Sequence, residues 1–215
     1  MPVLRRSTLP NAITVGRILL APVVFFLTLV PGFSARLIAF VVFVVAAVSD
    51  VWDGHLARKH GWITDFGKLV DPLADKLLLA ATLVPVYILS HRPGPVGALP
   101  HWGTLPLWVL VAIFGREALI TAVRAVAVRR GVVIPAGKAG KHKALAQNIF
   151  IGSTLLWYAL RTAALERGWE GWEWDAWQAF HGAVLAAALA AAVALTVYSL
   201  VVYLRGWRVL GRGAA

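Results

Sequence analysis

The chain has 215 residues, of which 60% are hydrophobic and only 14% are charged. Soluble domains carry about 25% charged residues, so this composition does not suit a water-soluble globular protein. The absence of cysteine excludes disulfide bonds, thiolate catalysis and cysteine-ligated zinc. The formal net charge is +11, but a nucleic-acid-binding domain needs a solvated surface on which to display its charge. We therefore expect a protein of the lipid bilayer that does not bind nucleic acid.

A helix that crosses the hydrocarbon of a bilayer needs about 20 mostly apolar residues. Six segments of the chain meet this requirement, which predicts an all-α, polytopic membrane protein with six transmembrane helices. We find no internal repeat and no linker, so the whole chain is expected to form one membrane domain. In chain order the segments are Asn11–Val30, Arg36–Lys59, Phe66–Ser90, Leu105–Val128, Ala144–Leu165 and Trp177–Leu204.

The positive charges predict the orientation, because lysine and arginine accumulate in cytoplasmic loops. One set of loops and both termini hold most of them, and the other set holds only Arg36, Arg92, Arg161 and Arg167. Both termini are therefore expected to face the cytoplasm. Four tryptophans lie at the outer end of the last hairpin, and we interpret them as an interfacial aromatic belt rather than a binding site. They are Trp169, Trp172, Trp174 and Trp177.

Acidic residues occur where the bilayer should exclude them. A charged side chain at membrane depth costs about 3 kcal/mol unless it is paired or faces a wet cavity. Asp50 and Asp53 share one face of the second segment, and Asp71 and Asp75 share one face of the third. We expect these two faces to meet near the cytoplasmic ends of their helices, which places the active site between the second and third helices. Glu117 is a further acid inside the fourth segment.

Four close carboxylates repel each other, and a divalent cation compensates this repulsion. An all-oxygen ligand set selects Mg²⁺, Mn²⁺ or Ca²⁺ over zinc or copper. Gly54, Ala57 and Gly67 remove side-chain bulk beside the acids, so that a metal-bound ligand can approach. Arg58 is placed to bind phosphate oxygens, and metals beside an arginine suit displacement at phosphorus. The alternative is that the acids only form ion pairs with basic neighbours: Arg58, Lys68 and Lys76.

The stretch from Asp50 to Asp75 resembles the signature of the CDP-alcohol phosphotransferase family, DxxDGxxARx8GxxxDxxxD. The resemblance implies six membrane helices, two Mg²⁺ or Mn²⁺ ions and a homodimer. It also implies transfer of a substituted phosphate from a CDP-linked donor to an alcohol, with release of CMP. By the same resemblance Asp50, Asp53, Asp71 and Asp75 are metal ligands, and Asp75 is the base for the acceptor hydroxyl.

The segment from Pro10 to Arg17 is similar to the PNxLTxxR opening of the phosphatidylglycerophosphate synthase and cardiolipin synthase branches. Residues 64–76 have the TDFGKxxDPxADK form of those branches. The resemblance implies CDP-diacylglycerol as the donor and a bacterial inner-membrane location. The residues that would bind this donor are Asn11, Thr14, Arg17, Asp50, Gly54, Ala57, Arg58 and Gly67.

Two further elements resemble the phosphatidylglycerophosphate synthase branch, whose acceptor is sn-glycerol 3-phosphate. Residues 115–124 are similar to its ARExxxxxxR helix, and residues 140–147 to its GKxKTxxQ element, with Ala144 in place of the threonine. The acceptor phosphate would be bound by Arg116, Arg124, Lys141 and Lys143. We expect another helix to pair with Arg116, because Glu117 is rotated about 100° from it on a helix.

The leading hypothesis is therefore transfer of the phosphatidyl group from CDP-diacylglycerol to glycerol 3-phosphate. One alternative is a cardiolipin synthase of the same family, which uses phosphatidylglycerol as the acceptor. An alternative of another class is a divalent-cation transporter, since acids on two facing helices can form an ion path. Against transport, the acids cluster at one depth, and Arg58 lies among them.

Overall fold

The computed structural model describes residues 3–60, 64–129 and 138–212, and within this part of the chain it consists of helices and connecting loops. Each of the six apolar segments corresponds to one helix, although the fourth segment begins two residues before its helix does. The helices are α1 (Val3–Leu29), α2 (Phe33–His60), α3 (Asp65–Ser90), α4 (Leu107–Arg129), α5 (Lys138–Arg167) and α6 (Trp172–Arg212).

Four stretches within the described residues are long and apolar enough to cross a bilayer: Asn11–Leu29, Phe33–Trp52, Val70–Ser90 and Trp172–Arg205. They belong to α1, α2, α3 and α6. Charged side chains interrupt α4, and polar residues of α5, among them Gln147 and Asn148, lower its mean hydropathy. The chain is thus an all-helical membrane protein, and the apolar character of its helices is uneven.

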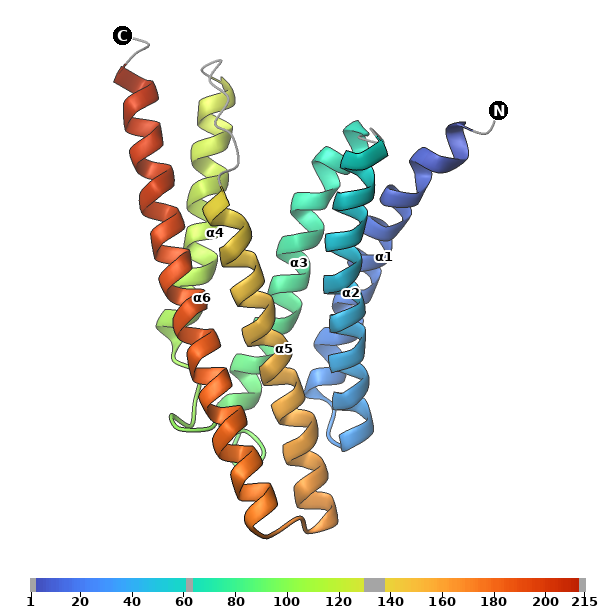
Figure 1. Cartoon of the computed structure of the whole chain (residues 1–215), viewed down its shortest axis with the longest axis vertical. Coiled ribbons are helices and arrows are strands. Elements are labelled where there is room, and N and C mark those ends of the chain that lie inside the picture. Colours follow the sequence, from blue (N-terminus) through green and yellow to red (C-terminus); the bar gives the residue numbers. More distant parts are fainter. Residues whose placement is uncertain (1–2, 61–63, 130–137, 213–215) are drawn as a thin grey trace.

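The helices form two arms that diverge from each other (Figure 1). One arm contains α1, α2 and α3, with α1 packed against both of its partners. The other contains α4 and α6, which pack together, and α5 lies between the arms in contact with α2 and α6. The arms are farthest apart at the end where α1 begins and α6 ends (Figure 1).

The core lies where α5 meets the first arm. Phe150 and Tyr158 of α5 are fully buried, as are Leu83 and Val86 of α3. A Cβ atom on Gly152 of α5 would lie 3.5 Å from Cε1 of Phe43 on α2, so the two helices approach closely at this crossing. The outward faces instead expose large apolar side chains, as expected for helices in contact with lipid.

Candidate active site

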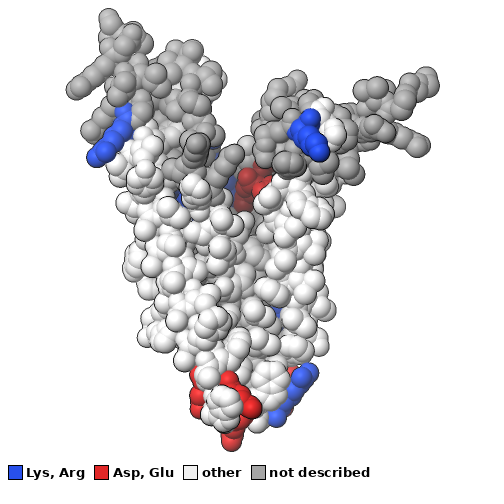
Figure 2. Space-filling model, in the orientation of Figure 1, with Lys and Arg blue, Asp and Glu red and all other residues white. Residues whose placement is uncertain are grey.

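A cavity of about 390 Å³ lies between the arms, on the side where they diverge. In Figure 2, acidic atoms occupy the notch between the arms, and basic atoms lie beside them. Phe43, Ala47 and Ile151 are among the apolar residues that line the cavity. Its charged lining residues come from five helices and are Arg17, Asp50, Asp75, Lys76, Arg116, Glu117, Arg124 and Lys143.

The acidic half of the cavity is organised around Arg17 of α1, whose side chain is only 2% exposed. Its Nη1 donates hydrogen bonds to Oδ1 of Asp50 on α2 and to Oδ1 of Asp75 on α3, the latter at 2.8 Å. Its Nη2 lies 3.7 Å from Oδ1 of Asp71. Acids from α2 and α3 therefore converge on one guanidinium, which α1 can supply because it packs against both helices.

The described side chains bear on only one of the ion pairs considered as the alternative explanation of the acids, that of Lys76. Arg58 and Lys68 lie outside the residues whose side chains the structure describes, and Lys76 donates from Nζ to Oγ1 of Thr121 at 2.7 Å. Among the described side chains, the cation that pairs with Asp50 and Asp75 is Arg17, which the resemblance assigns only to donor binding. The available signal was its position inside an apolar segment, where an arginine requires an anionic or polar partner.

The residues of the N-terminal motif lie against the start of α3. Oγ1 of Thr14 donates to Oδ1 of Asp71 at 2.6 Å, and this threonine is buried. Oγ1 of Thr64 caps α3 by accepting from the backbone N–H of Gly67 at 3.0 Å, and donates to Oδ1 of Asn11 at 2.7 Å. Asn11, Thr14 and Arg17 are spaced three residues apart on α1, so one face of this helix supplies all three contacts.

Gly67 has a reason to be glycine that the sequence did not show. A Cβ atom at this position would lie 3.2 Å from Oγ1 of Thr64, 3.4 Å from Oδ1 of Asn11 and 3.7 Å from Oδ2 of Asp71. The space beside Gly67 is therefore filled by polar side chains of the chain itself. The side chains of Asp53, Ala57 and Arg58, and the surroundings of Gly54, lie outside the description.

The carboxylates of α2 and α3 are the candidate ligands for a metal ion. Among the described side chains, which do not include Asp53, no group of three His, Cys, Asp or Glu residues is arranged to hold a metal ion. The donor atoms are nevertheless all oxygens, and Asp50 and Asp75 already direct one oxygen each at the same cationic nitrogen. This chemistry fits a hard divalent cation, provided that the guanidinium of Arg17 shifts or shares the carboxylates.

In the basic half of the cavity, the carboxylate of Glu117 on α4 accepts hydrogen bonds from the surrounding cations. Nζ of Lys143 donates to Oε1 of Glu117, and Nη1 of Arg116 lies 3.1 and 3.3 Å from its two carboxylate oxygens. Glu117 therefore also pairs with Arg116, which the sequence did not predict, because the long side chains bridge the angle between adjacent positions. Another helix does contribute, since Nε of Arg116 donates to Oγ of Ser199 on α6 at 3.1 Å.

The remaining residues predicted to bind the acceptor phosphate lie nearby or outside the description. The guanidinium of Arg124 lines the cavity and lies 5.6 Å from the ring centre of Tyr203. Ala144, which stands where a threonine was expected, also lines it. The side chain of Lys141 is not described. The structure thus brings Arg116, Arg124 and Lys143 to one wall, with the carboxylate of Glu117 among them.

Comparison with known proteins yields a consistent family match. The family model described as CDP-alcohol phosphatidyltransferase matches residues 7–198. A Mycobacterium tuberculosis protein named probable phosphatidylglycerophosphate synthase is 38% identical over 156 residues, covering 71% of this chain and 68% of its own length. A Bacillus subtilis protein named CDP-diacylglycerol–glycerol-3-phosphate 3-phosphatidyltransferase is 35% identical over 160 residues, covering 69% and 76% respectively. An Arabidopsis thaliana protein of the same name, numbered 2, is 32% identical over 208 residues, covering 94% and 81%.

Proposed function

The chain belongs to the CDP-alcohol phosphatidyltransferase family, and from that premise we propose that it transfers the phosphatidyl group of CDP-diacylglycerol to sn-glycerol 3-phosphate. The relatives named for this reaction come from two bacterial lineages and a plant. The observation that carries the proposal is the division of one cavity into an acidic and a basic half. An acidic half suits a metal-bound diphosphate, and a basic half suits the phosphate of the acceptor.

Two Mg²⁺ or Mn²⁺ ions are proposed as cofactors, held by Asp50, Asp53, Asp71 and Asp75. Bound ions would neutralise the diphosphate of the donor and stabilise the negative charge that develops on the departing CMP. The chain's own contribution is to fix the carboxylates. Thr14 donates to Asp71, and Arg17 restrains Asp50 and Asp75 by charge and hydrogen bonds.

The proposed chemistry is an in-line displacement at the phosphorus that carries diacylglycerol. A carboxylate oxygen of Asp75 accepts the proton of the C1 hydroxyl of glycerol 3-phosphate. The hydroxyl oxygen then forms a bond to phosphorus, the bond from this phosphorus to the CMP oxygen breaks, and CMP leaves. Arg116, Arg124, Lys141 and Lys143 hold the acceptor phosphate, and Asn11, Gly54, Ala57, Arg58 and Gly67 belong to the donor side.

The proposed topology has six membrane spans, with α4 and α5 inserted despite their polar residues. Arg116, Glu117 and Arg124 of α4 and Lys143 of α5 line the cavity between the arms, and such placement reduces the cost of insertion. We further propose that both termini and the diverging end of the arms face the cytoplasm of a bacterial cell, that the membrane is the inner one, and that the chain forms a homodimer.

Incubation of the purified protein with CDP-diacylglycerol and each labelled acceptor tests the proposal. Phosphatidylglycerophosphate is expected from glycerol 3-phosphate. Product formed only from phosphatidylglycerol would identify a cardiolipin synthase instead. Flux of divalent cations into liposomes without CMP release would favour a transporter.

Replacing Gly67 with leucine is expected to weaken the use of CDP-diacylglycerol. The larger side chain displaces Thr64 and Asn11, which form two hydrogen bonds at the start of α3. At about 1 kcal/mol for each bond, kcat/KM for the donor should fall roughly 10- to 30-fold. Gly16→Leu is the matched control, because a Cβ atom there meets nothing within 4 Å. Equal donor kinetics for wild type and Gly67→Leu would contradict this role.

Replacing Glu117 with glutamine is expected to strengthen anion binding in the basic half. The amide keeps a hydrogen-bond acceptor but removes the charge that neutralises Arg116 and Lys143. Charged and neutral hydrogen bonds differ by about 1 kcal/mol, so the inhibition constant of sulfate against glycerol 3-phosphate should fall about fivefold. Glu166→Gln, at the other end of the molecule, is the control. An unchanged sulfate constant would show that Glu117 does not compete for these cations.

A further inference from the structure

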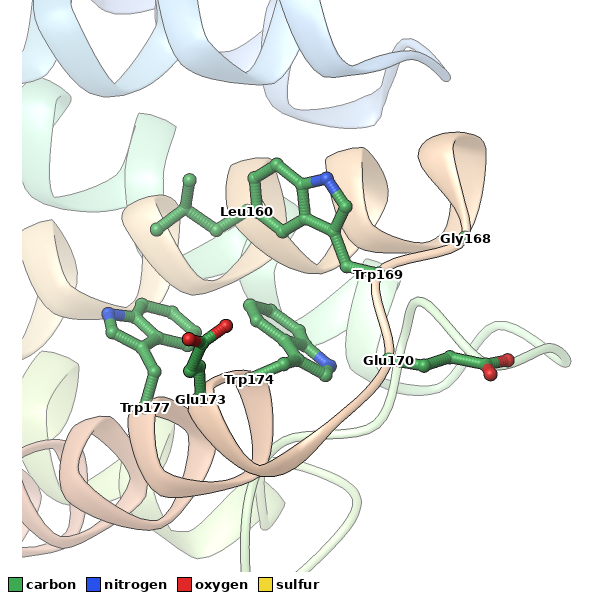
Figure 3. Close-up of a pocket in the computed structure, with 7 residues that line it drawn as sticks. All are labelled: Leu160, Gly168, Trp169, Glu170, Glu173, Trp174 and Trp177. Carbon is green, nitrogen blue, oxygen red and sulfur yellow. The ribbon is translucent and has the colours of Figure 1, made fainter.

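A second cavity, of about 470 Å³, lies where α5 ends and α6 begins, at the end of the molecule opposite the notch. Three indole rings line it, together with the side chain of Leu160. In Figure 3, Trp169 and Leu160 lie on one side, and Trp174 and Trp177 lie on the other. The sequence predicted only an interfacial belt here, but three of the four tryptophans surround a common space.

The walls of this cavity are fixed by contacts among the three indoles and with residues behind them. The rings of Trp174 and Trp177 stack 5.0 Å apart at 12°, and Trp177 stacks in turn on His181 at 4.6 Å. Trp169 meets Trp174 edge-on, with ring centres 5.6 Å apart and an interplanar angle of 70°. The turn that carries Trp169 is closed by its N–H, which donates to the carbonyl of Ala164 at 2.9 Å. Two indole walls therefore stand nearly perpendicular in a supported corner.

The charge of the cavity is uniformly negative. Its two charged lining residues among those described are Glu170 and Glu173, and both are exposed. The carboxylate of Glu173 lies beside Trp174 and Trp177 in Figure 3, whereas that of Glu170 points away from the rings. The guanidinium of Arg167 is not part of the lining and lies between two rings, 5.0 Å from the ring centre of Phe33 and 5.9 Å from that of Trp169.

We propose that this cavity binds an organic cation of the trimethylammonium class. Indole faces attract cations, and aromatic corners combined with carboxylates are the usual receptors for methylated ammonium groups. The methyl groups would contact the apolar rings while Glu173 supplies the opposite charge. Small inorganic cations fit less well, because they require six or more oxygen ligands and this cavity offers few. A free solute and a lipid headgroup both present this group.

Equilibrium dialysis of radiolabelled tetramethylammonium against the full-length protein tests the proposal. The protein is placed in nanodiscs made only of phosphatidylglycerol, which lacks the group. Saturable binding is expected, and Trp174→Ala should weaken it about tenfold or more. The matched control is Trp172→Ala, because Trp172 is 76% exposed and does not line the cavity. Glu173→Gln should also weaken binding, whereas Asp175→Asn, outside the lining, should not.

The neutral isostere 3,3-dimethylbutan-1-ol separates cation recognition from simple apolar binding. It should not displace tetramethylammonium, and equal competition by it would overturn the proposal. Absence of saturable binding would also overturn the proposal, as would an equal loss of affinity in Trp172→Ala and Trp174→Ala. The tryptophans would then be only an interfacial aromatic belt. Phosphatidylcholine added to the nanodiscs should compete if the natural occupant is a lipid headgroup, and an affinity unchanged by it assigns the site to a soluble cation. Every variant should retain wild-type transferase turnover, which verifies folding independently of binding.

Discussion

Replacing Asp75 with asparagine is expected to abolish nearly all turnover while the protein still inserts into the membrane. The change removes the proposed base for the acceptor hydroxyl, and loss of a general base alone lowers the rate about 10²- to 10⁴-fold. Loss of a metal ligand adds to this effect. The measurement is CMP release at saturating Mg²⁺. Asp50→Asn, Asp53→Asn and Asp71→Asn are expected to be similarly inactive.

Asp175→Asn provides the control, because this acid lies in the first turn of α6, at the opposite end of the molecule. It should retain wild-type turnover. A variant of Asp53 or Asp71 that keeps more than about a tenth of the wild-type rate would contradict metal ligation by that residue. Binding of Mn²⁺, followed by its paramagnetic effect, separates loss of the metal from loss of the base.

Replacing Lys143 with alanine is expected to lower kcat/KM for glycerol 3-phosphate roughly 10- to 150-fold, because a hydrogen bond to a charged group contributes about 1.5–3 kcal/mol. The side chain of Lys143 is only 7% exposed and reaches Glu117, so its ammonium is fixed in the wall of the cavity. The KM for CDP-diacylglycerol should remain nearly unchanged, because the donor is held by the acidic half. Steady-state kinetics with each substrate varied in turn provides the measurement.

Lys138→Ala is the matched control, since the sequence assigns Lys138 to topology and to contact with lipid headgroups. It should change neither KM value. An increase in the donor KM for Lys143→Ala, with the acceptor KM unaltered, would contradict the acceptor assignment. The basic wall would then be a surface for headgroups, and the choice of acceptor would depend on the named relatives alone.

The helices could be predicted from the sequence because long apolar runs leave few alternatives in a bilayer. The residues at which the helices begin and end could not be predicted. The helix α6 begins five residues before the expected span and continues to Arg212, because helical hydrogen bonding does not stop where the apolar run stops. The packing order of the helices also carries no local signal, so the sequence could not show that α1 packs against both α2 and α3 and brings Arg17 between them.

The acidic residues of the site could be predicted because carboxylates in an apolar helix stand out at any position. The basic residues could be found from the sequence motifs, but their pairing with Glu117 could not be predicted. The prediction for Glu117 relied on helical geometry for Cβ directions, whereas the flexible ends of Arg116 and Lys143 decide where the charges meet. The polar contacts around Gly67 were likewise hidden, because Asn11 and Thr64 are far from each other in sequence.

The acidic half of the cavity belongs to one arm, whereas the basic half is shared by the other arm and by α5, which lies between the arms. The carboxylates are carried by α2 and α3, and Glu117 and its cations by α4 and α5, so no single helix fixes the separation between them. That separation depends on how closely α5 crosses α2 at Gly152 and Phe43. Selection on catalysis therefore extends to apolar residues that never touch a substrate. A methyl group at Gly152 would still fit in van der Waals contact with Phe43, whereas a side chain longer than that of alanine would push α5 and α2 apart and change the distance between the acidic and basic residues.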